Sequence, residues 1–253
     1  MRQLDGPLTR RIILIFLLVG AQGALGWWMV SSGLVDRVEV SQYRLAAHLG
    51  LAFIIFALTF WTALSVLRPQ TAGEVISPLL RGLSHALAAL VFCQVILGAL
   101  VAGLRAGYRF NTWPLMEGSF VPKGAAMLRP FWRNFTENQA LVQFDHRMLA
   151  YAVALIIAAM WFWYRSRAAA AVKSALDLCL AAVCCQIVLG IWTLLTVVPL
   201  ALGLLHQTGA LLLFAATINL AHVLRGAPKS AKVEAIAVAA AATRSLGSGP
   251  SQL

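Results

Sequence analysis

Hydrophobic residues occur along this chain in long runs rather than in the short alternating patterns of a water-soluble protein. Six runs are each long enough to cross a bilayer as a helix, which takes about 20 residues. They lie near residues 11–31, 43–67, 79–104, 141–164, 175–198 and 200–224. Because hydrocarbon offers no partner to the backbone, each segment must satisfy its own N–H and C=O groups, as a helix does. The pattern predicts an all-α integral membrane protein with six transmembrane helices.

Polar stretches between the runs predict how the helices are connected. Pro199 leaves almost no loop between the fifth and sixth runs, so these two helices should form an antiparallel hairpin. The longest connection, about 105–140, mixes aromatic and basic residues, which is typical of a segment lying on a membrane surface. The alanine-rich residues 226–253 are too few to span a bilayer, and we expect a disordered cytoplasmic tail.

Composition and charge support a membrane protein. The chain is 60% apolar and only 11% charged, whereas about 25% of residues are charged in soluble domains. The net charge of +11 comes from Lys and Arg residues that flank the apolar runs. This distribution indicates membrane topology rather than a nucleic-acid partner, and it favours both termini on the cytoplasmic side. We expect the bacterial inner membrane, or the mitochondrial inner membrane in a eukaryote.

The four cysteines, Cys93, Cys179, Cys184 and Cys185, all fall inside the apolar runs. They form no Cys-x-x-Cys pair and none lies in a loop, so the pattern favours buried apolar residues over disulfides or a zinc site.

A repeated motif marks the candidate site. Gln-x-x-Leu-Gly occurs in "QGALGWW" (22–28), "QVILGAL" (94–100) and "QIVLGIW" (186–192), each time in a helix expected to run from inside to outside. Each returning helix carries a histidine near its start: His48, His146 and His206. Each lies about five residues into its helix, or roughly 8 Å along the axis. Ionisable residues inside a span are costly, and three in register predict a functional site.

His85 and His222 fall instead near the inner ends of their helices, beside Ser84 and Asn219. We interpret these two histidines as interfacial residues.

Haem is the chemistry that best suits imidazoles facing one another in apolar surroundings. Zinc would need more ligands, and a proton relay would need a chain of acids, whereas Asp145 and Asp177 are the only acids near or inside the runs. Two neutral imidazoles can take the two axial positions of a haem, whose propionates require cations at the interface. Arg44 shares a helix face with His48, and Arg147 follows His146 directly. Both arginines are candidate propionate partners, although an arginine near a helix start can also reach the interface without a ligand.

Several long strings closely resemble the haem A synthase family. They are "GALGWWMVSSGL", "SQYRLAAHLGLAF", "LGALVAGLRAGYRFNTWPLMEG", "FDHRMLAY" and "GLLHQTGALLLF", and the resemblance covers about residues 10–225. It implies two pseudo-symmetric four-helix halves, eight spans in all, with one haem in each half. The implied activity is oxidation of the ring D methyl group of haem O to a formyl group, giving haem A for terminal oxidases.

The resemblance also implies roles for individual residues. His146 and His206 match the histidines that hold a haem b in the C-terminal half, and His48 matches the second histidine of the substrate-haem half. The implied partners are haem O, haem A, haem O synthase, oxidase assembly factors and a second copy of the chain.

The chain departs from the family at its beginning. The family starts with another Gln/Gly-bearing helix, a long outer loop, and a helix with a Glu shortly before a His-Arg pair, and these are absent here. The six runs therefore correspond to the last six of the eight spans. Residues 1–68 are the expected remainder of the N-terminal half, 69–225 the haem b bundle and 226–253 the tail. His48 lacks its partner, and we expect a late start rather than a working six-helix synthase. The absence of loop cysteines places the chain with the cysteine-free members.

Alternative functions remain open on the sequence. A membrane cytochrome that only passes electrons would need His146 and His206 but not the His48 unit, and an inactive fragment of the synthase would look the same. A transporter should show broken helices and a polar site at the midplane, whereas the polar residues here lie near the outer face.

Overall fold

Residues 6–31, 40–68 and 77–225 are described by the computed structural model. Within these ranges, six helices are long and apolar enough to cross a membrane. They are α1 (Gly6–Ser31), α2 (Gln42–Leu67), α3 (Pro78–Gly103), α6 (Gln139–Tyr164), α7 (Ala170–Leu195) and α8 (Leu200–Val223). The predicted all-α membrane fold is confirmed, although α1 and α7 begin earlier than expected and α7 ends at Leu195. The predicted tail, 226–253, lies outside the described residues.

Polar and proline residues define where several helices begin. The Ser77 side chain accepts a hydrogen bond from the Leu80 N–H, and Pro78 occupies the first helical position of α3. Asn138 caps α6 by accepting from the N–H groups of Ala140 and Leu141. Such caps satisfy N–H groups that the helix itself leaves free. The start of α6, and with it the depth of His146, is therefore set by local sequence.

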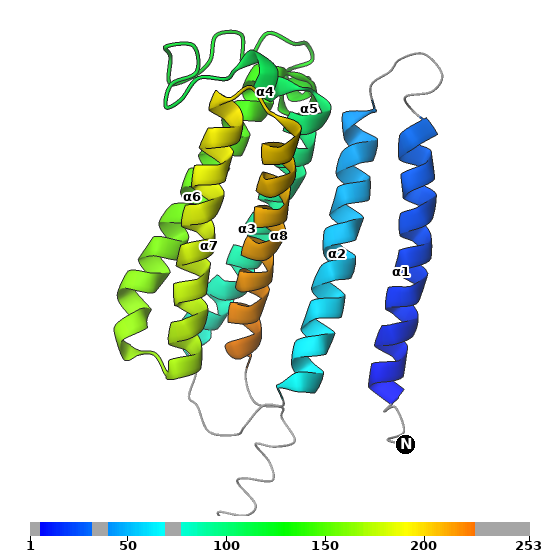
Figure 1. Ribbon diagram of the computed structural model, residues 1–253, viewed down its shortest axis with the longest axis vertical. Helices are drawn as coiled ribbons and strands as arrows, with labels where there is room; N and C mark the ends of the chain where they lie inside the picture. The colour runs from blue at the N-terminus through cyan, green and yellow to red at the C-terminus, as the bar shows by residue number, and fades with distance from the viewer. Residues whose placement is uncertain (1–5, 32–39, 69–76, 226–253) are drawn as a thin grey trace, which may run out of the picture.

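Four of the long helices form a bundle in which each contacts two neighbours. Helix α3 packs against α6 and α8, and α7 packs against the same two helices. Helices α6 and α8 therefore face each other across the bundle, as α3 and α7 do. Helix α2 lies against α3 and α8, and α1 packs on α2 at the edge of the molecule (Figure 1).

Phe214 joins α2 to the four-helix bundle. Its ring lies 5.4 Å from that of Phe53, 6.5 Å from Phe56 and 6.3 Å from Phe92, measured between centroids. Aromatic pairs at such distances add to the stabilisation from burial alone. This cluster holds the His48-bearing helix beside the bundle that carries His146 and His206.

The long connection between α3 and α6 folds over one end of the bundle (Figure 1). It contains α4 (Ala106–Arg109), the 3-10 turn η1 (Phe131–Arg133) and α5 (Asn134–Glu137). Asn134, fully buried, exchanges hydrogen bonds with both backbone groups of Leu128 and donates to the Phe131 carbonyl. The connection is thus internally bonded, and its placement on a membrane surface stays a prediction.

The hairpin between α7 and α8 is confirmed. These helices are in extensive contact, and four residues, 196–199, connect them. Val197 and Val198 both adopt positive φ angles, 62° and 55°. Branched residues rarely adopt this left-handed conformation, so the turn stores strain.

The expectation that the cysteines are buried is wrong for three of them. Cys179 is fully buried, whereas Cys93, Cys184 and Cys185 are exposed on the surfaces of α3 and α7. Thiols tolerate an apolar surface as well as a core, so position in an apolar run does not distinguish the two environments.

Candidate functional site

Each candidate histidine is hydrogen-bonded to the glutamine of the preceding long helix. The side-chain amide of Gln22 donates to the main-chain carbonyl of His48 at 3.0 Å. Gln94 and Gln186 make the same contact with His146 and His206 at 2.9 Å. The repeated glutamine of the sequence is therefore in direct contact with the repeated histidine in every case.

The amides also approach the imidazole rings. The nitrogen of Gln22 lies 3.3 Å from Nε2 of His48, and that of Gln186 lies 3.5 Å from Nε2 of His206. In the middle unit, Gln94 lies 3.0 Å from Nδ1 and 3.3 Å from Nε2 of His146. One amide group thus holds both the backbone and the ring of its histidine.

The glycine four residues after each glutamine lies against the same ring. A Cβ atom added to Gly26 would lie 3.0 Å from Cε1 of His48. The corresponding distances are 3.2 Å from Gly98 to His146 and 2.9 Å from Gly190 to His206. These separations are at or below the usual limit for carbon contacts. Only glycine leaves the room that each imidazole occupies.

His146 and His206 are brought together by the bundle. They lie on α6 and α8, which face each other across it. They lie seven and six residues after the first residues of their helices, somewhat deeper than expected, and His48 lies six residues into α2. Two imidazoles on opposite helices of an apolar bundle are residues that could hold a haem between them.

Several polar atoms of the site are buried and have no hydrogen-bond partner among the residues that the structure describes. They are Oε1 of Gln22, Gln94, Gln186 and Gln143, Nδ1 of His48 and His206, and Nε and Nη1 of Arg147. Buried polar groups are nearly always paired. Their concentration around the three histidines and Arg147 indicates a site built for a polar or metal-bearing ligand.

Arg147 directly follows the candidate ligand His146 on α6, but its side chain points toward the connection between α3 and α6. It is 8% exposed, and its Nη2 donates to the Phe110 carbonyl at 3.1 Å. Gln143, one turn earlier, donates to the same carbonyl at 2.8 Å. A cavity of about 290 Å³ lies beside Arg147, lined also by Trp113, Tyr151 and other apolar residues. The two unpaired donors of Arg147 could donate hydrogen bonds to a carboxylate that enters this cavity.

Arg44 is already engaged by α1. Its Nη1 donates to the Trp28 carbonyl at 2.7 Å, and its guanidinium lies 4.4 Å from the centroid of the Trp28 ring. The structure thus places the Arg44 side chain of α2 against the C-terminal end of α1. Sequence alone did not show that a helix end and an aromatic ring already hold this cation.

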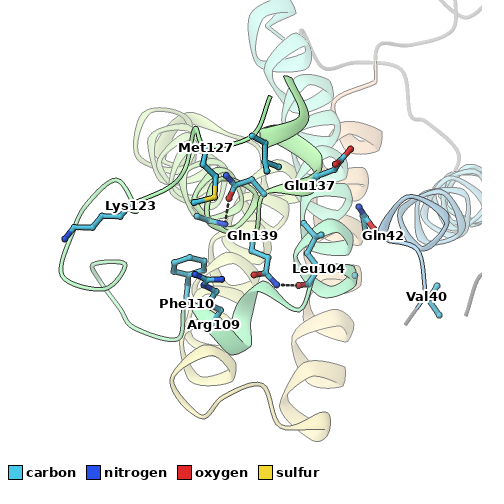
Figure 2. A pocket seen from close by; sticks show the side chains of 13 residues that line it. Val40, Gln42, Leu104, Arg109, Phe110, Lys123, Met127, Glu137 and Gln139 are labelled. Carbon is cyan, nitrogen blue, oxygen red and sulfur yellow. Dashed lines mark hydrogen bonds between the residues drawn. The ribbon is translucent and has the colours of Figure 1, made fainter. Parts of the chain in front are cut away.

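A larger hollow, whose lining residues include none of the histidines, lies among the helix ends and the connecting segments (Figure 2). It has a volume of about 460 Å³ and lies where α2 and α6 begin and α3 ends. In it, Gln139 donates to the Leu104 carbonyl at 2.6 Å, and Glu137 accepts a hydrogen bond from Arg133 that lowers the pKa of its carboxyl group. Lys123 extends away from the other lining residues (Figure 2). This hollow is therefore formed by helix ends and the connection between α3 and α6, not by the histidine site.

Comparison with known proteins identifies the family. The model of the COX15–CtaA family, described as cytochrome oxidase assembly proteins, matches residues 1–218. The chain belongs to this family. Proteins named heme A synthase are similar to it: that of Parvibaculum lavamentivorans is 50% identical over 226 residues, and that of Nitrosospira multiformis is 50% identical over 230. Each alignment covers 88% of this chain, and the chain spans 63% and 64% of these relatives. That of Maricaulis maris is 47% identical over 229 residues, with 65% of that protein covered.

The two remaining histidines lie away from this site. His222 is 3% exposed, lies 3.3 Å from the Ser65 hydroxyl through Nε2, and packs edge-on against Trp61 at 5.1 Å. It is therefore a buried, hydrogen-bonded residue that joins α2 to the last turn of α8, and its place at a membrane interface stays a prediction. His85 is exposed and lies 6.3 Å from the same Trp61 ring.

Proposed function

We propose that this chain forms part of a haem A synthase and that His146 and His206 hold a haem b. The observation that supports the proposal most directly is the pairing of two histidines on opposite helices of one bundle, each held by a glutamine and a glycine. Bound there, the haem would supply one-electron transfer within the membrane. The similarity to proteins named heme A synthase supports the same activity.

The protein's own residues would bind and orient this group. His146 and His206 would hold the haem iron through their imidazole nitrogens, and each ring must be unprotonated at the nitrogen that binds. Arg147 offers its two unpaired donors to a propionate, which would compensate its buried charge.

The His48 unit is proposed to lie on the substrate side. It repeats the geometry of the other two units, with Gln22 and Gly26 against the ring. Residues 1–68 would then belong to a half that takes haem O, while 69–225 form the haem b half. The substrate and the oxidation of its ring D methyl to a formyl group are properties of the whole synthase. Arg44 is the candidate partner of a propionate in this half, and it would have to exchange its contact with Trp28 for that role.

The proposed function also implies a membrane location and a set of partners. An integral membrane protein is supported by the six long apolar helices within the described residues and by the family. We propose the bacterial inner membrane, with both termini cytoplasmic and the three histidines toward the outer side. Haem O synthase, oxidase assembly factors and a second copy of the chain are the proposed protein partners.

The haem assignment is tested by absorption spectroscopy on the purified 253-residue chain. It should carry one low-spin haem b, and His146→Leu and His206→Leu should each strip or destabilise it. His85→Leu is the matched control, because this exposed histidine lies at the other end of the bundle. A normal six-coordinate spectrum in both ligand variants would refute the assignment.

A membrane cytochrome that only passes electrons is the second candidate. It is favoured by the completeness of the α3–α6–α7–α8 bundle within the described residues. The two functions separate in cells that supply haem O. The test measures haem A made by this chain alone and by this chain co-expressed with, or joined to, the N-terminal part of a relative named heme A synthase. Haem A from either supports the synthase, whereas retained haem b with no haem A from either supports the cytochrome.

A further inference from the structure

The three glutamine–glycine pairs, Gln22 with Gly26, Gln94 with Gly98 and Gln186 with Gly190, make the same contacts with their histidines. In each, the amide lies 2.9–3.0 Å from a histidine carbonyl, and the glycine Cα–H faces Cε1 of the ring. Gln and His side chains can hydrogen-bond between membrane helices as part of ordinary packing. Here, however, one amide approaches both the backbone carbonyl and the ring of a histidine in all three pairs. The repetition suggests that the contact serves the histidine itself.

The hydrogen-bonding pattern shows what the amide does. A ring nitrogen that accepts the amide N–H must be unprotonated, so a neutral ring carries its proton on the other nitrogen. In His48 and His206 that other nitrogen is Nδ1, which is buried and has no partner among the described residues. The Oε1 atom of every paired glutamine is likewise buried and unpartnered in this part of the chain. The His48 and His206 units thus hold a carbonyl acceptor without a donor beside an imidazole with an unpartnered nitrogen. In the His146 unit the acceptor is also unpartnered, while the amide of Gln94 approaches both ring nitrogens.

An iron-bound imidazole needs such an acceptor. Metal-ligating histidines almost always donate their second ring N–H to a nearby oxygen, which fixes the orientation of the ring and raises its basicity. We propose that the glutamine–glycine pairs position the three imidazoles for iron: the glycine leaves room for the ring edge, the amide N–H holds the histidine backbone, and Oε1 accepts the ring N–H once iron occupies the other nitrogen. This inference rests on the proposed haem function. It assigns the His48 unit the same device, so that Gln22 and Gly26 prepare this histidine for the substrate haem.

Helix α8 carries a further feature of this device. A Cβ atom on Gly209 would collide with Oε1 of Gln186. Gly209 lies one turn beyond His206, so α7 leaves room for the ring at Gly190 and α8 leaves room for the glutamine oxygen at Gly209. Gly209→Ala should therefore displace the amide without touching either the histidine or Gly190.

The test uses the full chain, purified with its haem. Gln186→Leu and Gly190→Ala should each lower haem affinity by about 10- to 100-fold, the usual effect of losing an outer partner of a metal ligand. The matched controls are Gly203→Ala, whose added methyl meets nothing within 4 Å, and Gln207→Leu, at an exposed position next to His206. Both should leave haem binding unchanged.

A readout that a purely structural role would not change is the midpoint potential. Gln186→Leu removes the acceptor and should raise the potential, because a less basic imidazole stabilises the ferric iron less. Gln186→Glu keeps an acceptor and should lower it. In the haem-free protein, ¹⁵N resonances of His206 should shift in Gln186→Leu and Gly209→Ala but not in Gly203→Ala.

The outcomes separate the two proposals. A wild-type chain that binds no haem overturns the proposed function. A wild-type chain that binds haem, with Gln186 and Gly190 variants that match the controls in affinity, potential and ¹⁵N shift, overturns the positioning role alone.

Discussion

Replacing Arg147 by methionine should have opposite effects on the haem-free and the haem-loaded protein. Arg147 is a buried cation that donates to the Phe110 carbonyl and leaves Nε and Nη1 unpaired among the described residues. Arg147→Met removes the charge and keeps an unbranched side chain of similar length. Gln143 continues to donate to Phe110, so the carbonyl does not lose its last side-chain donor.

The magnitude follows from these contacts. Each unpaired buried donor costs about 1–3 kcal/mol, and the lost hydrogen bond from a charged group contributes about 1.5–3 kcal/mol. The balance favours the variant, and replacement of buried charges by apolar residues often stabilises proteins by about 1–4 kcal/mol. We expect the haem-free Arg147→Met protein to be about 1–2 kcal/mol more stable than wild type. In the haem-loaded protein, Arg147→Met would remove a hydrogen bond between charged groups, which contributes about 1.5–3 kcal/mol. Its loss should weaken haem binding by about 10- to 150-fold.

Thermal unfolding in detergent, with and without haem, and a haem titration measure the two effects. Arg109→Met is the matched control, because Arg109 is exposed and its guanidinium lies over the Phe110 ring at 5.6 Å. It should change neither quantity appreciably. If Arg147→Met binds haem as tightly as wild type, Arg147 holds no propionate, and the unpaired donors need another explanation.

Three further predictions concern other parts of the chain. In a longer protein that supplies the family's first two helices, His48→Gln should abolish haem A formation and keep the haem b spectrum; wild-type haem A would make His48 a core residue. Arg133 lowers the pKa of Glu137, which also accepts a hydrogen bond from Tyr43 at 3.0 Å. This anchor of the connection between α3 and α6 should therefore be intact above the ordinary glutamate pKa, near 4.5, and be lost as pH falls through the lowered value. Proteolysis of the connection should then increase in acid, and a Glu137→Gln variant cleaved at the wild-type rate at neutral pH would contradict this. Val197→Gly should raise thermal stability by about 0.5–1 kcal/mol, since a left-handed branched residue costs roughly 1–2 kcal/mol and glycine about 0.5–1; a lower melting temperature would show that the turn is unstrained.

The sequence by itself determined the helices and the repeated unit. Length and hydrophobicity are local properties, so the spans could be read directly, with errors of a few residues at their ends where capping and fraying decide. The Gln-x-x-x-Gly spacing and the histidine of the next helix are local too. Three occurrences were therefore enough to select His48, His146 and His206 as candidate site residues, and the structure shows each of them in contact with its repeated glutamine.

Only the tertiary structure decided which partner each polar residue has. The order of helices around the bundle places α6 opposite α8, and this order depends on packing between segments far apart in the chain. The same packing turned Arg147 toward Phe110, gave Arg44 a partner in Trp28, and buried His222 against Trp61. A long apolar run shows that a polar residue within it lies inside a span, because the whole segment is removed from water together. It does not show which neighbouring helix supplies the hydrogen bond, because that choice is made by the shapes of two surfaces meeting.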